Sequence, residues 1–173
     1  SQRLMLTGIS PASAIWSMKH ERNAMATSYT VLDSGVLLAT VQLEILTDAA
    51  ITLMNALGET ESQIIAPSLL HYEIVAVVRK WVYRGLTSPE NANAALSTLL
   101  HYPVRTVMDE ALLRRAYDLA NIHNRPTAYD SQYLAVAERY ECDFWTTDER
   151  LYNAVSSQFP RIFWLGNQRP QIR

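Results

Sequence analysis

The sequence has a single cysteine, Cys142, and only two lysines among its 173 residues. One cysteine cannot form an intramolecular disulfide, and sparing use of cysteine is typical of a reducing cytoplasm, where we expect the protein to reside. No apolar run approaches the roughly 20 residues that a membrane-spanning helix needs, so no membrane partner is predicted. The run at 4–6 is too short for a signal-peptide core, although the small residues at 10–14 leave a secretory alternative open.

An excess of positive charge is also lacking. The 15 basic and 17 acidic residues give a net charge of −2 and a pI near 6.1. This balance argues against a uniformly basic surface that coats nucleic acid. A nuclease is not excluded, because all the basic residues except the two lysines are arginine, which makes forked contacts with phosphate.

Glycine and proline are scarce, at five and seven residues, while 49% of the residues are hydrophobic and 18% are charged. This composition is that of a globular protein rather than a disordered or fibrous one. A chain of this length forms one domain with one core. A regular pattern begins at Tyr29, so we expect an N-terminal extension over residues 1–28, a core domain over 29–165 and a C-terminal tail over 166–173.

Short β-rich segments alternate with segments of helical periodicity along the core domain. The first strand is predicted to end in a turn at residues 33–35, and Pro67 is predicted to open the second helix. Because helical segments of ten or more residues separate the strands, we expect a three-layer α/β/α sandwich with a mainly parallel central sheet. The predicted strands are 29–32, 63–66, 104–107, 142–146 and 161–165, and the predicted helices begin near residues 46, 67, 88, 109, 127 and 149.

Four acidic residues stand at unusual positions in this pattern. In an open parallel sheet the ligand site lies beyond the carboxyl ends of the strands. Asp33 follows the first predicted strand, Asp148 follows the fourth, and Glu73 lies about two helical turns past the second. Glu73 and Asp130 also lie on the apolar, core-facing sides of their helices, where a carboxylate needs a compensating partner. The pattern predicts one shared site at this edge.

A structural interpretation of the same acids stays open. Asp33 and Asp148 are suited to capping helices, and Thr127 with Asp130 is spaced as a capping box. Glu73 would then be held by an ion pair with an arginine. The shared site is favoured because acids from four separate elements map to the same edge.

Oxygen ligands from several carboxylates suit Mg²⁺ or Mn²⁺, whereas zinc requires histidine and cysteine at short spacing. The four histidines form no such cluster in the sequence. Crowded carboxylates repel one another and tend to retain protons, and a bound cation would keep them ionised. We therefore expect the stability of the protein to depend on metal.

Several sequence motifs carry a family resemblance. The segments 129–135 (YDSQYLA), 146–151 (TTDERL) and 31–38 (VLDSGVLL) resemble the C-terminal half and the opening strand of PIN-domain proteins of the VapC toxin type. Glu73, at the end of PSLLHYE, fits the second acid of that family. The resemblance covers about residues 29–165 and leaves the N-terminal extension outside it.

The resemblance implies that Asp33, Glu73, Asp130 and Asp148 bind a divalent metal ion, and that Thr146 supports the last of these acids through its hydroxyl group. It also implies cleavage of RNA phosphodiester bonds. VapC-type proteins are often the toxin of a toxin-antitoxin pair and commonly form homodimers, so an antitoxin partner and a homodimer are expected.

The sequence leaves individual roles open. Glu73 is either a metal ligand or the acceptor of a proton from the attacking water. Arg79 and Arg125 are candidates for contacts with the substrate phosphate.

The competing function is a PIN-like module that binds RNA or protein without cutting. Other classes lack required residues: there is no G-x-x-x-x-G-K loop, no G-x-G-x-x-G motif, no lysine after a late strand and no second aspartate two positions after Asp33.

Overall fold

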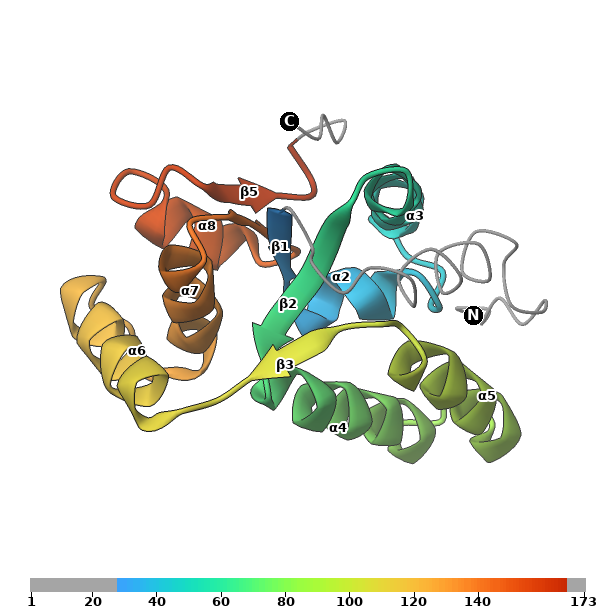
Figure 1. Ribbon diagram of the computed structural model, residues 1–173. Helices are drawn as coiled ribbons and strands as arrows, with labels where there is room; N and C mark the ends of the chain where they lie inside the picture. The colour runs from blue at the N-terminus through green and yellow to red at the C-terminus, as the bar shows by residue number, and fades with distance from the viewer. Residues whose placement is uncertain (1–27, 168–173) are drawn as a thin grey trace.

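A computed structural model of the chain describes residues 28–167, which fold around one five-stranded sheet (Figure 1). All the strand pairs are parallel, in the order β3-β2-β1-β4-β5. The strands are β1 (Ser28–Leu32), β2 (Ser62–Pro67), β3 (Arg105–Val107), β4 (Asp143–Thr146) and β5 (Ile162–Trp164). The three-layer α/β/α expectation is confirmed.

Seven helices cover the two faces of the sheet. In Figure 1, α6, α7 and α8 lie on one side of the sheet, and α2, α3, α4 and α5 lie on the other. Their apolar stripes supply the core together with the strands. Their bounds are α2 (Ser34–Ala39), α3 (Thr47–Gly58), α4 (Leu69–Tyr83), α5 (Pro89–Leu100), α6 (Glu110–Ile122), α7 (Tyr129–Arg139) and α8 (Glu149–Val155).

The pairing register of the central strands determines which side chains meet in the core of the sheet. Val31 lies beside Ile65 on one neighbouring strand and Phe144 on the other, and all three side chains are fully buried. Helix α7 packs on this face, where the rings of Tyr133 and Phe144 stack with centroids 5.8 Å apart. Burial on both faces explains why β1, β2 and β4 each contain a run of adjacent apolar residues. No helix in residues 28–167 is long and apolar enough to span a membrane.

Three local expectations were wrong. Residues 33–35 do not form a simple turn, because the short helix α2 begins at Ser34. Pro67 ends β2, where it pairs with Val107, and does not open α4. Thr127 does not begin α7, whose first residue is Tyr129 and whose N-cap, Ala128, makes no capping bond through its side chain. The expected extension at 1–28 and tail at 166–173 lie almost wholly outside the described residues.

The end of α7 contains an unfavourable backbone conformation. The amide of Cys142 donates to the carbonyl of Ala137, and the amide of Glu141 donates to that of Glu138. These two bonds form a Schellman motif, which requires a left-handed residue at Glu141, where φ is 49°. Glycine or asparagine normally takes this position, because a side chain at positive φ costs about 1–2 kcal/mol.

We therefore predict that Glu141→Gly stabilises the protein by about 1 kcal/mol, since relief of the left-handed strain exceeds the extra backbone entropy of glycine. The melting temperature should rise by about 3 °C. Glu141→Ala is the matched control, because it removes the same carboxylate and keeps the Cβ atom. Equal melting temperatures for the two variants would contradict the assignment of strain to this residue.

Candidate active site

Asp33 is the residue that joins three elements at the carboxyl edge of the sheet. It follows β1 and caps α2, because its Oδ1 atom accepts a hydrogen bond of 2.9 Å from the Val36 amide. Its Oδ2 atom accepts a 2.5 Å bond from the Thr146 hydroxyl and a 3.2 Å bond from the Thr147 amide. The carboxylate therefore fixes the start of α2 against the end of β4.

This junction needs a glycine. A Cβ atom on Gly35 would lie 2.0 Å from the Thr147 hydroxyl oxygen and 3.2 Å from the Oδ1 atom of Asp33. The first turn of α2 can approach the loop after β4 only because residue 35 has no side chain. The Asp-Ser-Gly sequence thus supplies a carboxylate and the space in which it meets the neighbouring strand.

Glu73 faces this junction from α4. Its Oε2 atom accepts a 2.5 Å hydrogen bond from the hydroxyl of Tyr133 on α7. The Ser34 side chain also hydrogen-bonds the Tyr133 oxygen, which places the phenol between Glu73 and the start of α2. Only 2% of Tyr133 is exposed, so its hydroxyl serves as a fixed, buried donor. Glu73 makes no ion pair within residues 28–167, so the described part of the chain does not support the arginine-pair interpretation of this acid.

Burial dominates the electrostatics of Asp33. Burial raises the pKa of Asp33 to about 6, against the opposing effect of its three hydrogen-bond donors, and the charge of Glu73 raises it further. Burial, followed by the charge of Glu73, also raises the pKa of Tyr133 far above its usual range. Within the described part of the chain, neither Asp33 nor Glu73 forms an ion pair with a lysine or arginine. These two neighbouring carboxylates therefore have no basic side chain as a counter-ion in this part of the chain.

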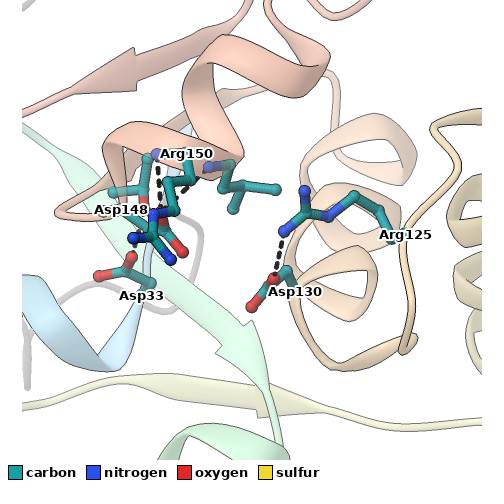
Figure 2. A network of polar contacts seen from close by, with 7 residues as sticks. Asp33, Arg125, Asp130, Asp148 and Arg150 are labelled. Carbon is teal, nitrogen blue, oxygen red and sulfur yellow. Dashed lines mark hydrogen bonds and ion pairs between the residues drawn. The ribbon is translucent and has the colours of Figure 1, made fainter.

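Asp130 and Asp148 have other partners (Figure 2). Asp130, at the start of α7, accepts a 3.4 Å hydrogen bond from the guanidinium group of Arg125. Asp148 caps α8, because its Oδ1 atom accepts bonds of 2.8 and 3.0 Å from the Arg150 and Leu151 amides. The capping interpretation is thus confirmed for Asp33 and Asp148, and Asp130 makes an ion pair instead of a capping box.

The predicted acids come from four elements, but their side chains do not converge on one point. Across residues 28–167, no three His, Cys, Asp or Glu side chains lie close enough to hold one metal ion. The donor set nevertheless fits a hard divalent cation, because the unpaired and mutually repelling carboxylates of Asp33 and Glu73 supply only oxygen ligands. A cation shared by all four acids would require their side chains to move closer together.

The Thr146 hydroxyl bonds Asp148, the expected acid, and also bonds Asp33. The Thr146 hydroxyl donates to the carboxylate of Asp33 and accepts a 2.9 Å bond from the backbone amide of Asp148. It therefore orients the Asp33 side chain and the Asp148 main chain, not the Asp148 carboxylate. Arg79 lies on the exposed side of α4, with its guanidinium 5.7 Å from the ring centroid of Tyr83, and contacts none of the four acids.

Two residues of the site, Tyr133 and Arg150, were not identified from the sequence. Tyr133 offered a signal, because a tyrosine on the buried face of a helix needs a partner for its hydroxyl. The sequence signal for Arg150 was weaker and consisted only of its position two residues after Asp148. Its side chain is exposed and makes no ion pair within the described residues, and Figure 2 shows it beside Asp148.

Comparison with known proteins identifies the class to which this fold and these acids belong. The sequence profile of the PIN domain family matches residues 30–156, and the chain belongs to that family. It is similar to the protein named Ribonuclease VapC12 from two strains of Mycobacterium tuberculosis, with 32% identity over 122 residues. The similar region covers 70% of this chain and 88% of that protein. The resemblance to VapC-type members of the family is confirmed.

The raised pKa of Asp33 predicts a pH-dependent stability in the absence of metal. The folded state binds this proton more tightly than the unfolded state, so its contribution is greatest below pH 4 and is lost as the pH rises to about 6. The loss over the whole window should be about 3 kcal/mol, and roughly half of it falls between pH 5 and pH 7.5. Thermal melts in EDTA at these two pH values measure that part.

The control for this experiment is Asp33→Asn, which removes the titrating group. His123 acts in the opposite direction, because burial and then the charges of Arg115 and Arg125 lower its pKa. The difference between wild type and variant therefore isolates Asp33. An equal pH dependence in the two proteins would contradict the assignment.

The Tyr133 hydroxyl should stabilise the fold through Glu73. Tyr133→Phe keeps the ring and removes the donor, so we expect a loss of about 1–2 kcal/mol and a melting temperature lower by about 3–6 °C. Tyr129→Phe is the matched control on the same helix, because the Tyr129 side chain is exposed. A decrease of similar size in both variants would show that the bond to Glu73 is not responsible.

Proposed function

We propose that this chain is a divalent-metal-dependent endoribonuclease that uses Mg²⁺ or Mn²⁺. The observation that carries the proposal is the pair of carboxylates, Asp33 and Glu73, which lie near each other at the carboxyl edge of the sheet and form no ion pair with a basic side chain in residues 28–167. Membership of the PIN domain family and similarity to a protein named as a ribonuclease support RNA as the substrate. Hydrolysis of a phosphodiester bond is the reaction that such an acid set promotes.

Each side chain of the site has its own proposed role. Asp33, Asp130 and Asp148 are proposed metal ligands, and Glu73 is a ligand through its Oε1 atom, because Oε2 is already held by Tyr133. When bound, the divalent ion would activate a water for in-line attack and neutralise charge on the leaving oxygen. Thr146 keeps the Asp33 carboxylate oriented toward the site through its hydroxyl group.

Arginine side chains are proposed to bind the RNA backbone. Arg125 lies against Asp130, and Arg150 is exposed beside Asp148, so both can reach a phosphate that is held near the acids. Arg79 stacks with Tyr83 on the surface of α4 and contacts none of the four acids. An RNA contact by Arg79 is therefore a separate prediction. Arg79 would contact RNA that extends beyond the cleaved bond.

The proposed biological role is the toxin of a toxin-antitoxin pair in the cytoplasm. Similarity to a VapC-named protein supports an antitoxin partner and a homodimer. The surface of α4 also supports protein partners, because Tyr72 and Tyr83 on this helix are 75% and 80% exposed. Cys142, the only cysteine in the chain, is buried, and burial raises its pKa to about 11, so its thiol is unreactive.

The second candidate is a PIN-like module that binds RNA or protein without cutting. The pairing of Asp130 with Arg125 favours it, since an acid that is neutralised by an arginine contributes less to a metal site. The isolation of Asp33 and Glu73 from any cation within the described residues opposes it. We therefore favour the nuclease.

The deciding experiment is cleavage of a panel of structured RNAs by the purified protein with Mg²⁺, with Mn²⁺ and with EDTA. We expect cuts with metal, none in EDTA, and a loss of at least about 100-fold in Asp33→Asn, which removes a proposed ligand. Glu110→Gln is the control, because Glu110 is an exposed acid paired with Arg114 on α6. No cleavage with either metal, together with no rise in melting temperature, would support the binding module.

A further inference from the structure

Arg125 is held at the site by its own backbone. The amides of Asn124 and Arg125 donate to the carbonyls of Asn121 and Ala120, which forms a Schellman motif at the end of α6. Asn124 takes the left-handed conformation that the motif requires, with φ of 48°. Pro126 follows and restricts the backbone of Arg125 to extended conformations. The sequence Asn-Arg-Pro therefore fixes the point from which the Arg125 side chain reaches Asp130.

The guanidinium of Arg125 is poorly satisfied in this position. Its side chain is only 19% exposed, its bond to the Oδ2 atom of Asp130 is long at 3.4 Å, and its Nε atom is buried without a hydrogen-bond partner in the described part of the chain. The adjacent His123 also buries its Nδ1 atom unpaired. Most buried polar groups are hydrogen-bonded, and a partly buried cation with one long bond is costly.

Asp130 is the acid whose position this contact controls. Asp33 and Glu73 have no arginine or lysine partner within residues 28–167, and Asp148 bonds only the backbone of its own helix. The ion pair with Arg125 is therefore the one interaction in this part of the chain that would compete with a metal cation for one of the four acids. It is also weak enough to be displaced.

We propose that Arg125 is the resident counter-ion of Asp130 and that the two separate when a divalent cation binds. This inference rests on the proposed function, because it requires the acids to bind metal. Before metal arrives, Arg125 neutralises Asp130 and limits repulsion among the carboxylates. After metal binds, Asp130 turns to the cation, and the released guanidinium is free to bind a phosphate oxygen of the RNA. Arg125 is thus a positioning residue that couples metal binding to RNA binding.

Competition between Arg125 and the metal ion can be recognised from the direction in which metal affinity changes when Arg125 is replaced. An arginine that only supports the structure would weaken metal binding when it is removed, because the site would lose its shape. Arg125 as a competitor predicts the opposite, namely tighter metal binding with weaker RNA binding. We expect Arg125→Gln to tighten Mn²⁺ binding by about three- to tenfold, the range for loss of one partly buried ion pair.

The test is calorimetric titration of the metal-free full chain with Mn²⁺, followed by binding of a short fluorescent RNA in EDTA and in Ca²⁺. Arg84→Gln is the matched control, since Arg84 is exposed at the end of α4 and its removal takes away the same charge without breaking an ion pair in the described residues. We expect Arg125→Gln to bind Mn²⁺ more tightly than wild type, Arg84→Gln to change little, and Arg125→Lys to fall between wild type and Arg125→Gln. Arg125→Gln should also lose the increase in RNA affinity that Ca²⁺ gives the wild type.

The outcomes separate the inference from the function on which it rests. Unchanged or weaker Mn²⁺ binding in Arg125→Gln, or equal tightening in both glutamine variants, overturns the exchange and leaves the nuclease proposal intact. A wild type that binds no Mn²⁺, or an Asp33→Asn variant that binds it as well as wild type, overturns both. Circular dichroism and melting in EDTA show that each variant is folded before its titration is interpreted.

Discussion

The burial of the Asp33 carboxylate is the constraint on which the rest of the site depends. Its two oxygens accept hydrogen bonds from α2 and from the end of β4, so a single side chain aligns two connections that are more than 100 residues apart in sequence. These donors favour the ionised form, but burial and the nearby Glu73 outweigh them, and the pKa rises to about 6. The fold therefore holds a charge that its own hydrogen bonds do not fully stabilise.

Much of the architecture follows from periodicity in the sequence. Strand segments separated by long amphipathic segments predicted the parallel sheet, because only a crossover connection joins neighbouring parallel strands. The short helix α2 was not predicted, since its six residues follow an Asp-Ser-Gly sequence that is typical of a turn. Pro67 was misplaced for a related reason, because proline is favoured at the first turn of a helix and is also tolerated at a strand end such as that of β2.

The site was predictable in position but not in detail. The rule that ligands bind at the carboxyl ends of parallel strands identified the edge at which Asp33 and Asp148 lie. Capping and site formation were weighed as alternatives, but Asp33 does both, because its Oδ1 atom caps α2 while its Oδ2 atom bonds the end of β4. Contacts between distant elements were not readable from spacing. The bond between Tyr133 and Glu73 spans 60 residues and depends on how α7 and α4 pack around the sheet.

The four acids fall into two classes, and this division explains how the fold tolerates them. Asp33 and Glu73 keep hydrogen-bond donors but no counter-ion within the described residues, whereas Asp130 has Arg125 and Asp148 has two backbone amides. Four adjacent carboxylates without partners would oppose folding, because their repulsion adds to the cost of burial. The partners of Asp130 and Asp148 lower that cost. Their bonds engage Oδ2 of Asp130 and Oδ1 of Asp148, so the other carboxylate oxygen of each residue is not used by these bonds, and the fold stabilises two of the acids without occupying them fully.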